Sequence, residues 1–468
     1  MYTLIADTIF DGQRLRRGVV RIPIVGSFMG RIARIEEELD VHPALDHDRR
    51  ELIDVRGSVL MPGLVNAHVH IARGGGFEVD EPPMPLQAAR NFVGALASGT
   101  TTVADLGSPP ALLRALAFVS NAPSVVGPDV FAAGPVLTAP SGYPLDWMPP
   151  WVARLGAAVA CDGPDKAKRA VHGVARAGMR FVKIAIMHQS YADKPLRALD
   201  VPTARAIVEE AHNLGLKVLA HAHSRADYRV ALAVGVDGLM HSAFDPLDDD
   251  TVRAVVDSGT PVCPTLWVFD SICALDSEEP AWADLSAHLS APVMSSLRRF
   301  AAAYRASDVV PPSPAAGLSK TRAREAMRCA AANLRLLHDA GARVVFGNDA
   351  AYGFSLVGRP ADELAAMQRA GLSVEDCLRA ATSEAASLLG LADRGAIAEG
   401  MRADLVVVSP SVMLDVGAVA HPSLVMKAGK IVVSTARRVR AGGPRALAKL
   451  AAAYSAGVVG TVGEAALG

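Results

Sequence analysis

The feature that most constrains the fold is a regular alternation of strand-like and helix-like segments through the middle of the chain. Short apolar runs, typical of buried strands, are separated by segments with helical periodicity, for example 203–214 and 321–340. The strand-like runs lie at 59–70, 100–105, 129–133, 180–186, 217–223, 238–241, 260–266 and 343–349. Eight parallel strands joined by helices close on themselves, so the sequence predicts an α/β fold with a (β/α)8 TIM barrel.

Both ends of the chain differ from this middle. Short strand patterns separated by turn residues occur before residue 58 and again at 403–409 and 423–434. We therefore expect a small β-sandwich domain formed by 1–58 and 394–440, a barrel domain at 59–393, and a C-terminal helical tail at 441–468.

Composition narrows the functional class. Among 468 residues, 47 Lys+Arg balance 48 Asp+Glu, so no basic field favours nucleic acid. No apolar run is long enough to span a membrane. The 5 cysteines form no Cys-x-x-Cys pair, which favours reduced thiols in a cytoplasmic protein. We expect a cytoplasmic homo-oligomer that acts on a small-molecule substrate.

Two histidines end the first barrel strand. His68 and His70 are two residues apart, so in a strand both imidazoles project from one face, roughly 6–7 Å apart. A lone pair of this kind is commonly a polar strand end. At the carboxyl end of a buried strand, however, two histidines need partners, and a metal ion satisfies them.

Lys183 lies inside an otherwise apolar strand. An unpaired ammonium group would be strongly penalised there. Two alternatives remain open: a carboxylate pairs with it across the barrel, or carbon dioxide carbamylates it into an anionic ligand with two oxygens.

Further polar residues sit at the same ends of later strands: His221 and His223 share one face of strand five, His241 ends strand six and Asp349 ends strand eight. A single buried histidine is commonly a satisfied core residue. Imidazoles and carboxylates that converge at one end of a barrel instead suit two adjacent divalent ions.

This order of residues resembles the amidohydrolase superfamily, and most closely its imidazolonepropionase-like and prolidase-like branch with a carboxylated lysine and a binuclear metal centre. The matching runs are 61–70, 99–107, 221–224, 235–241, 347–349 and 395–405. Two departures stand out. Asn348 occupies a position where relatives often have threonine, and 137–143 replaces a glycine- and histidine-bearing segment of peptidase relatives.

The resemblance implies a ligand set for two divalent metal ions, with zinc expected. His68, His70 and Asp349 would hold one ion, His221 and His241 would hold the other, and a carbamate on Lys183 would bridge them. Asp349 would act as general acid and base, and His223 would contact the substrate or a ligand. The candidate catalytic residues are therefore Asp349, Lys183 and His223.

Long loops after strands three and seven are candidates for substrate walls, with surface decoration as the alternative. Their aromatic residues Tyr143, Trp147 and Trp267 are candidate substrate contacts. Arg225 could pair with a substrate carboxylate, or it could be a solvated residue at a helix start.

The function favoured by the resemblance is hydrolysis of an amide C–N bond in a cyclic amide, an N-acyl amino acid or a dipeptide-like substrate. A mononuclear deaminase or chlorohydrolase is an alternative, although such relatives usually carry a glutamate where this chain has Ser224. A non-catalytic metal-binding scaffold is another alternative.

Overall fold

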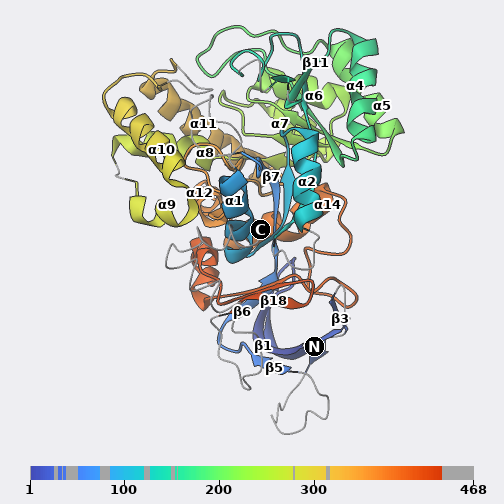
Figure 1. Ribbon diagram of the computed structural model, residues 1–468, viewed down its shortest axis with the longest axis vertical. Coiled ribbons are helices and arrows are strands. Elements are labelled where there is room, and N and C mark those ends of the chain that lie inside the picture. Colours follow the sequence, from blue (N-terminus) through green and yellow to red (C-terminus); the bar gives the residue numbers. More distant parts are fainter. Residues whose placement is uncertain are drawn as a thin grey trace.

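The computed structural model describes residues 2–25, 30–33, 35–37, 51–73, 85–120, 127–148, 153–154, 156–277, 280–311 and 317–434. A large α/β part and a smaller sheet follow one another along the long axis (Figure 1). The helical tail expected at 441–468 lies outside the described residues. No helix within the described ranges is both long and apolar enough to cross a membrane.

The smaller sheet combines strands from both ends of the described chain. Its order is β18-β17-β16-β6-β1-β2-β3, with β4 paired to β2 and β5 to β1. The strands are β1 (Tyr2–Phe10), β2 (Leu15–Val25), β3 (Arg31–Ile32), β4 (Glu36–Glu37), β5 (Glu51–Asp54), β6 (Val59–Pro62), β16 (Leu405–Val408), β17 (Leu424–Lys427) and β18 (Lys430–Ser434).

The predicted β-sandwich is not confirmed, because these strands form one 9-stranded hydrogen-bonded sheet. Strand β1 explains the continuity. It pairs with β5 through its first residues and with β6 at Ile9, and its register against β2 shifts between Ala6 and Thr8. Such a bulge bends the strand, so β1 can pair with β5 at one end and with β6 at the other.

Strand β16 packs the sheet against the larger part. Val406 and Val408 belong to a core cluster with Phe346 of the α/β part. Leu405 and Val407 instead pack with residues of the small sheet. Both faces of β16 are therefore buried, which is why its sequence is continuously apolar instead of alternating.

The larger part is a TIM-barrel-type α/β domain. Its parallel strands form a 3-stranded sheet, β7-β8-β9, and a 6-stranded sheet, β11-β10-β12-β13-β14-β15. The strands are β7 (Leu64–Val69), β8 (Thr100–Asp105), β9 (Asp129–Ala132), β10 (Val136–Thr138), β11 (Ala158–Ala160), β12 (Phe181–Ala185), β13 (Lys217–His221), β14 (Gly238–Met240) and β15 (Val262–Cys263).

The ladders between the described strands do not run continuously around a closed barrel. The segment expected to be the eighth strand, 343–349, forms no regular strand. It still lies between β15 and β7, because single bridges join Val344 to Val262 and Ala350 to Val69. At the other junction, the Arg180 N–H donates to the Ala132 carbonyl at 2.8 Å. Short, irregular strands explain the interruptions.

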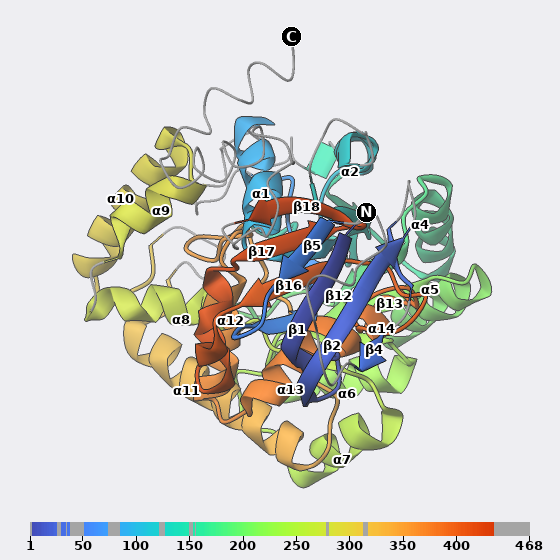
Figure 2. The ribbon, with the colours of Figure 1, turned by 90° about the horizontal axis from the view of Figure 1, so that it is seen from below.

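Helices surround these strands and spread around the periphery when the molecule is viewed from below (Figure 2). They are α1 (Pro85–Ala97), α2 (Pro110–Ser120), α4 (Pro164–Arg176), α5 (Val201–Asn213), α6 (Arg225–Val234), α7 (Asp249–Ser258), α8 (Trp267–Cys273), α9 (Trp282–His288), α10 (Ala291–Arg305), α11 (Lys320–Asp339), α12 (Pro360–Arg369), α13 (Val374–Arg379) and α14 (Ala385–Leu388).

Local sequence sets several helix ends. The Asp200, Ser224 and Asp248 side chains accept the N3 backbone N–H of α5, α6 and α7. The insertion after strand seven contains α8 to α10, and these helices pack into a separate apolar cluster with Tyr191 and Phe354. This insertion lies along one side of the strands (Figure 1).

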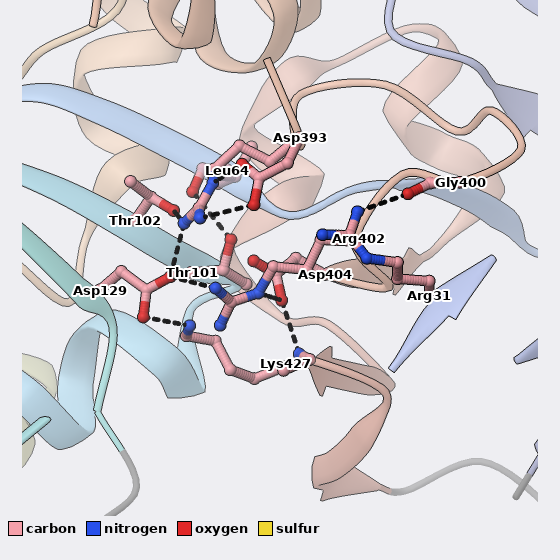
Figure 3. A network of polar contacts seen from close by, with 12 residues as sticks. Arg31, Leu64, Thr101, Thr102, Asp129, Asp393, Gly400, Arg402, Asp404 and Lys427 are labelled. Carbon is pink, nitrogen blue, oxygen red and sulfur yellow. Dashed lines mark hydrogen bonds and ion pairs between the residues drawn. The ribbon is translucent and has the colours of Figure 1, made fainter. Parts of the chain in front are cut away.

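A buried ion cluster joins the α/β part to the small sheet (Figure 3). Asp129 of β9 accepts from Arg394 at 2.5 Å, Arg402 at 2.8 Å and Lys427 at 2.7 Å. Arg394 and Arg402 also pair with Asp393 and Asp404. Burial alone raises the pKa of Asp129, but the three cations outweigh it and hold that pKa below its usual value.

Replacing Asp129 with asparagine is expected to lower the free energy of unfolding by roughly 3–5 kcal/mol at neutral pH, because three buried cations lose their shared carboxylate. Since the folded-state pKa is lowered, this stabilisation is complete above about pH 4 and disappears as the pH falls further. Urea unfolding of both proteins across this pH range measures it. Asp162→Asn is the control, because the Asp162 side chain is 54% exposed in its ion pair with Lys166; its cost should stay within about 1 kcal/mol. Equal losses in the two variants would contradict the prediction.

Candidate active site

The candidate ligands converge at the carboxyl ends of the strands. His68 is in β7, Lys183 is in β12 and His221 ends β13. One pocket with about 410 Å³ of empty volume is lined by all six predicted metal ligands: His68, His70, Lys183, His221, His241 and Asp349. None is more than 8% exposed. The structure therefore brings together residues that are up to 281 positions apart in the sequence, from His68 to Asp349.

Asp349 lies beside the first histidine pair. Its backbone N–H donates to the His68 carbonyl at 2.8 Å, which fixes the segment against β7. The Asp349 Oδ1 atom is 3.2 Å from His68 Nε2 and 3.0 Å from His70 Nε2. Burial, followed by the charge of Lys183, lowers the pKa of His68 well below its usual value and favours a neutral imidazole.

The other histidines form a second group. One nitrogen each from His221, His223 and His241 lies within 4.8 Å of the others. His241 Nδ1 is 2.7 Å from Thr265 Oγ1, and His223 Nε2 is 2.6 Å from the Tyr191 hydroxyl. Among the described residues, His221 Nε2 and His223 Nδ1 are buried without a hydrogen-bond partner.

Lys183 has no partner that would explain its burial. It is 3% exposed, and its Nζ makes no hydrogen bond within the described structure. Burial lowers the pKa of Lys183 to about 7, although the charge of Asp349 acts in the opposite direction. A neutral amine, the form that reacts with carbon dioxide, is thus readily populated near neutral pH.

Two of these positions have unusual backbone conformations. His241 has φ of 81° and Asp349 has φ of 49°, a left-handed region that side chains other than glycine seldom adopt. Such strain persists where the surrounding structure holds a side chain in a required direction. His241 directly follows β14, and Asp349 is the last residue of the segment 343–349.

The predicted substrate contacts are placed differently. Tyr143 lines the pocket, and its ring stacks on His221 with centroids 4.2 Å apart. The Trp147 ring lies beside the Tyr143 ring, with centroids 6.2 Å apart. Arg225 lies outside the lining and pairs with Asp248 at 3.5 Å. Trp267 begins α8 outside the lining, and its backbone N–H donates to Glu363 at 2.6 Å.

Sequence reasoning missed three residues of the site. Arg73 and Tyr352 line the pocket, and Tyr191 contacts His223. Arg73 is three residues beyond His70 and Tyr352 is three beyond Asp349. Their positions just past ligand-bearing strands were the available signal, because loops at that end of a barrel form its sites.

These features define a barrel-type enzyme with a histidine- and carboxylate-rich centre, and comparison with known proteins agrees. Residues 59–432 match the model of the amidohydrolase family. The chain belongs to this family and is a hydrolase that acts on carbon–nitrogen bonds. Uncharacterised proteins of Mycobacterium tuberculosis and Mycobacterium bovis are 29% identical over 379 residues, or 80% of this chain and 85% of theirs.

Solved structures share the fold. A Xaa-Pro dipeptidase with bound methionine is 20% identical, with a TM-score of 0.71 over 92% of this chain and 99% of that one. A prolidase complexed with N-methylphosphonate-L-proline is 22% identical, with a TM-score of 0.73 over 93% and 100%. An ochratoxinase of A. niger is 19% identical, with a TM-score of 0.70 over 92% and 95%.

Proposed function

We propose that this protein is a binuclear metal-dependent amidohydrolase of the prolidase-like branch, which cleaves an amide C–N bond in a cyclic amide, an N-acyl amino acid or a dipeptide-like substrate. The observation that carries the proposal is the convergence of four histidines, Lys183 and Asp349 in one buried pocket. A set this costly to bury needs compensation that the described residues do not provide.

The donor set fits metal ions. Oδ1 of Asp349 and Lys183 Nζ are buried without hydrogen-bond partners. The 3.0 and 3.2 Å separations from Asp349 to His70 and His68 match ligands that share an ion at bond lengths of about 2.0–2.2 Å. In this proposal His68, His70 and Asp349 would hold one ion, His221 and His241 would hold a second, and a carbamate on Lys183 would bridge them; zinc would suit these nitrogen and oxygen ligands.

Two divalent ions, when bound, polarise a carbonyl and make water a nucleophile at neutral pH. The remaining work falls to the chain. The Asp349 carboxylate accepts a proton at Oδ and returns it to the leaving nitrogen. The Thr265 hydroxyl holds His241 by Nδ1. The Tyr143 ring covers His221 and limits water, and His223 positions the substrate together with Tyr191.

Metal analysis tests this proposal. Protein purified with zinc and bicarbonate is expected to contain about two divalent ions per chain, because His68, His70 and Asp349 would hold one ion and His221 and His241 a second in the same pocket. Elemental analysis with the variant His241→Ala as comparison should give a value near one for the variant. One ion in the unmodified protein would favour the mononuclear hydrolase, and none would favour the scaffold.

A further inference from the structure

Arg73 introduces a permanent positive charge into the catalytic pocket. It lines the same cavity as Lys183, His221 and Asp349. Its guanidinium lies 4.4 Å from the centre of the Tyr352 ring and 5.9 Å from that of Trp147. No carboxylate of the described chain lies within ion-pair distance of it.

The cations of the cluster around Asp129 have an acidic partner. Arg394, Arg402 and Lys427 each contact Asp129 within 2.8 Å. Arg73 differs from them, because its guanidinium lies over the Tyr352 ring and its N–H groups have no acidic partner in the described structure. A stacked guanidinium is restricted in orientation, which lowers the entropy lost when it binds a planar carboxylate.

Arg73 is also close to the reacting centre. The Tyr352 ring that supports it meets the His70 ring edge to face, with centroids 5.2 Å apart. One aromatic ring thus separates the cation from a candidate metal ligand. Because Arg73, His70 and Asp349 line the same pocket, a substrate bound there lies beside both the cation and the candidate ligands.

We propose that Arg73 binds a carboxylate of the substrate, so that this enzyme hydrolyses acidic amides, such as N-acyl amino acids, in preference to neutral ones. The inference rests on the proposed hydrolysis and specifies its substrate class. It also replaces Arg225 as the carboxylate-binding residue, since Arg225 pairs with Asp248 outside the pocket.

The test compares N-acetyl-L-phenylalanine with its carboxamide, with acetate release as the measure. The acid should be preferred about 10- to 100-fold in kcat/KM, as a charge-assisted hydrogen-bonded pair implies. Arg73→Met should lose this preference, mainly through a higher KM for the acid, whereas Arg73→Lys should keep part of it. Arg298→Met is the matched control, because Arg298 is an exposed arginine stacked 4.7 Å over Trp282 and outside the pocket. Equal kcat/KM for acid and amide in the unmodified enzyme would overturn the proposal.

Binding separates this inference from the hydrolysis itself. Calorimetry with L-phenylalanine and L-phenylalaninamide needs no turnover. Tighter binding of the carboxylate that Arg73→Met abolishes would support the subsite even if neither acetylated compound released acetate, an outcome that would count against the hydrolysis. Equal binding of L-phenylalanine and L-phenylalaninamide by the unmodified protein, or no binding of either, would overturn the subsite and leave the proposed hydrolysis unaffected.

Discussion

Replacement of Lys183 by alanine is expected to lower kcat by about 10³-fold or more and to reduce the metal content to about one ion per chain. Metal coordination stabilises the transition state of such reactions by several kcal/mol, and each 1.36 kcal/mol of this stabilisation changes the rate about tenfold. The expectation follows from a buried Nζ without a hydrogen-bond partner and from a pKa of about 7 for Lys183. Steady-state kinetics and elemental analysis measure the two effects.

The variant Lys183→Arg separates the two explanations of this lysine. Arginine keeps the positive charge and pairs well with a carboxylate, but it does not form the carbamate. If Lys183 only paired with an acid, Lys183→Arg would retain activity and both ions. If the carbamate is the ligand, Lys183→Arg should be as impaired as Lys183→Ala, and only the alanine variant, which leaves space, should be partly rescued by acetate.

Asp349→Asn is expected to lower kcat by about 10⁴-fold or more. General acid–base catalysis alone contributes roughly 10²–10⁴-fold to the rate. This change also replaces the carboxylate, 3.0 Å from His70, with a weaker metal ligand. The asparagine side chain keeps an oxygen of similar size, so the loss should appear in kcat more than in KM. Kinetics on two substrates with different side chains should give the same loss, since proton transfer is common to both.

Leaving groups identify the proton transfer. In the hydrolysis of a 4-nitroanilide the leaving nitrogen departs without being protonated. In the hydrolysis of an alkylamide the leaving nitrogen must be protonated first. Asp349→Asn should therefore lose less activity on a 4-nitroanilide than on the corresponding alkylamide. Equal losses on both would remove proton delivery from Asp349 and leave it only as a ligand, and activity within about tenfold of the unmodified enzyme would remove it from the mechanism.

The strand pattern and the candidate ligands could be predicted from the sequence because both are local properties. Apolar runs report burial on both faces, as Val406 and Val407 of β16 illustrate. Parallel barrel strands present their carboxyl ends at one face, so polar residues at those ends lie close together regardless of the loops that connect the strands. This rule located His68, Lys183 and Asp349 in the sequence, and the structure places all three in one pocket.

Pairing between distant segments could not be predicted in this way. Three features depend on contacts between residues far apart in the sequence. They are the bulge in β1, the placement of Arg225 beside Asp248, and the arrangement of Arg73 on Tyr352. The order of the strands and the chemical character of the residues at their ends follow from the sequence alone. Which charged loop residues face the pocket depends on the folded chain, because loop direction and ion-pair choice depend on the packing of the whole chain and not on local periodicity.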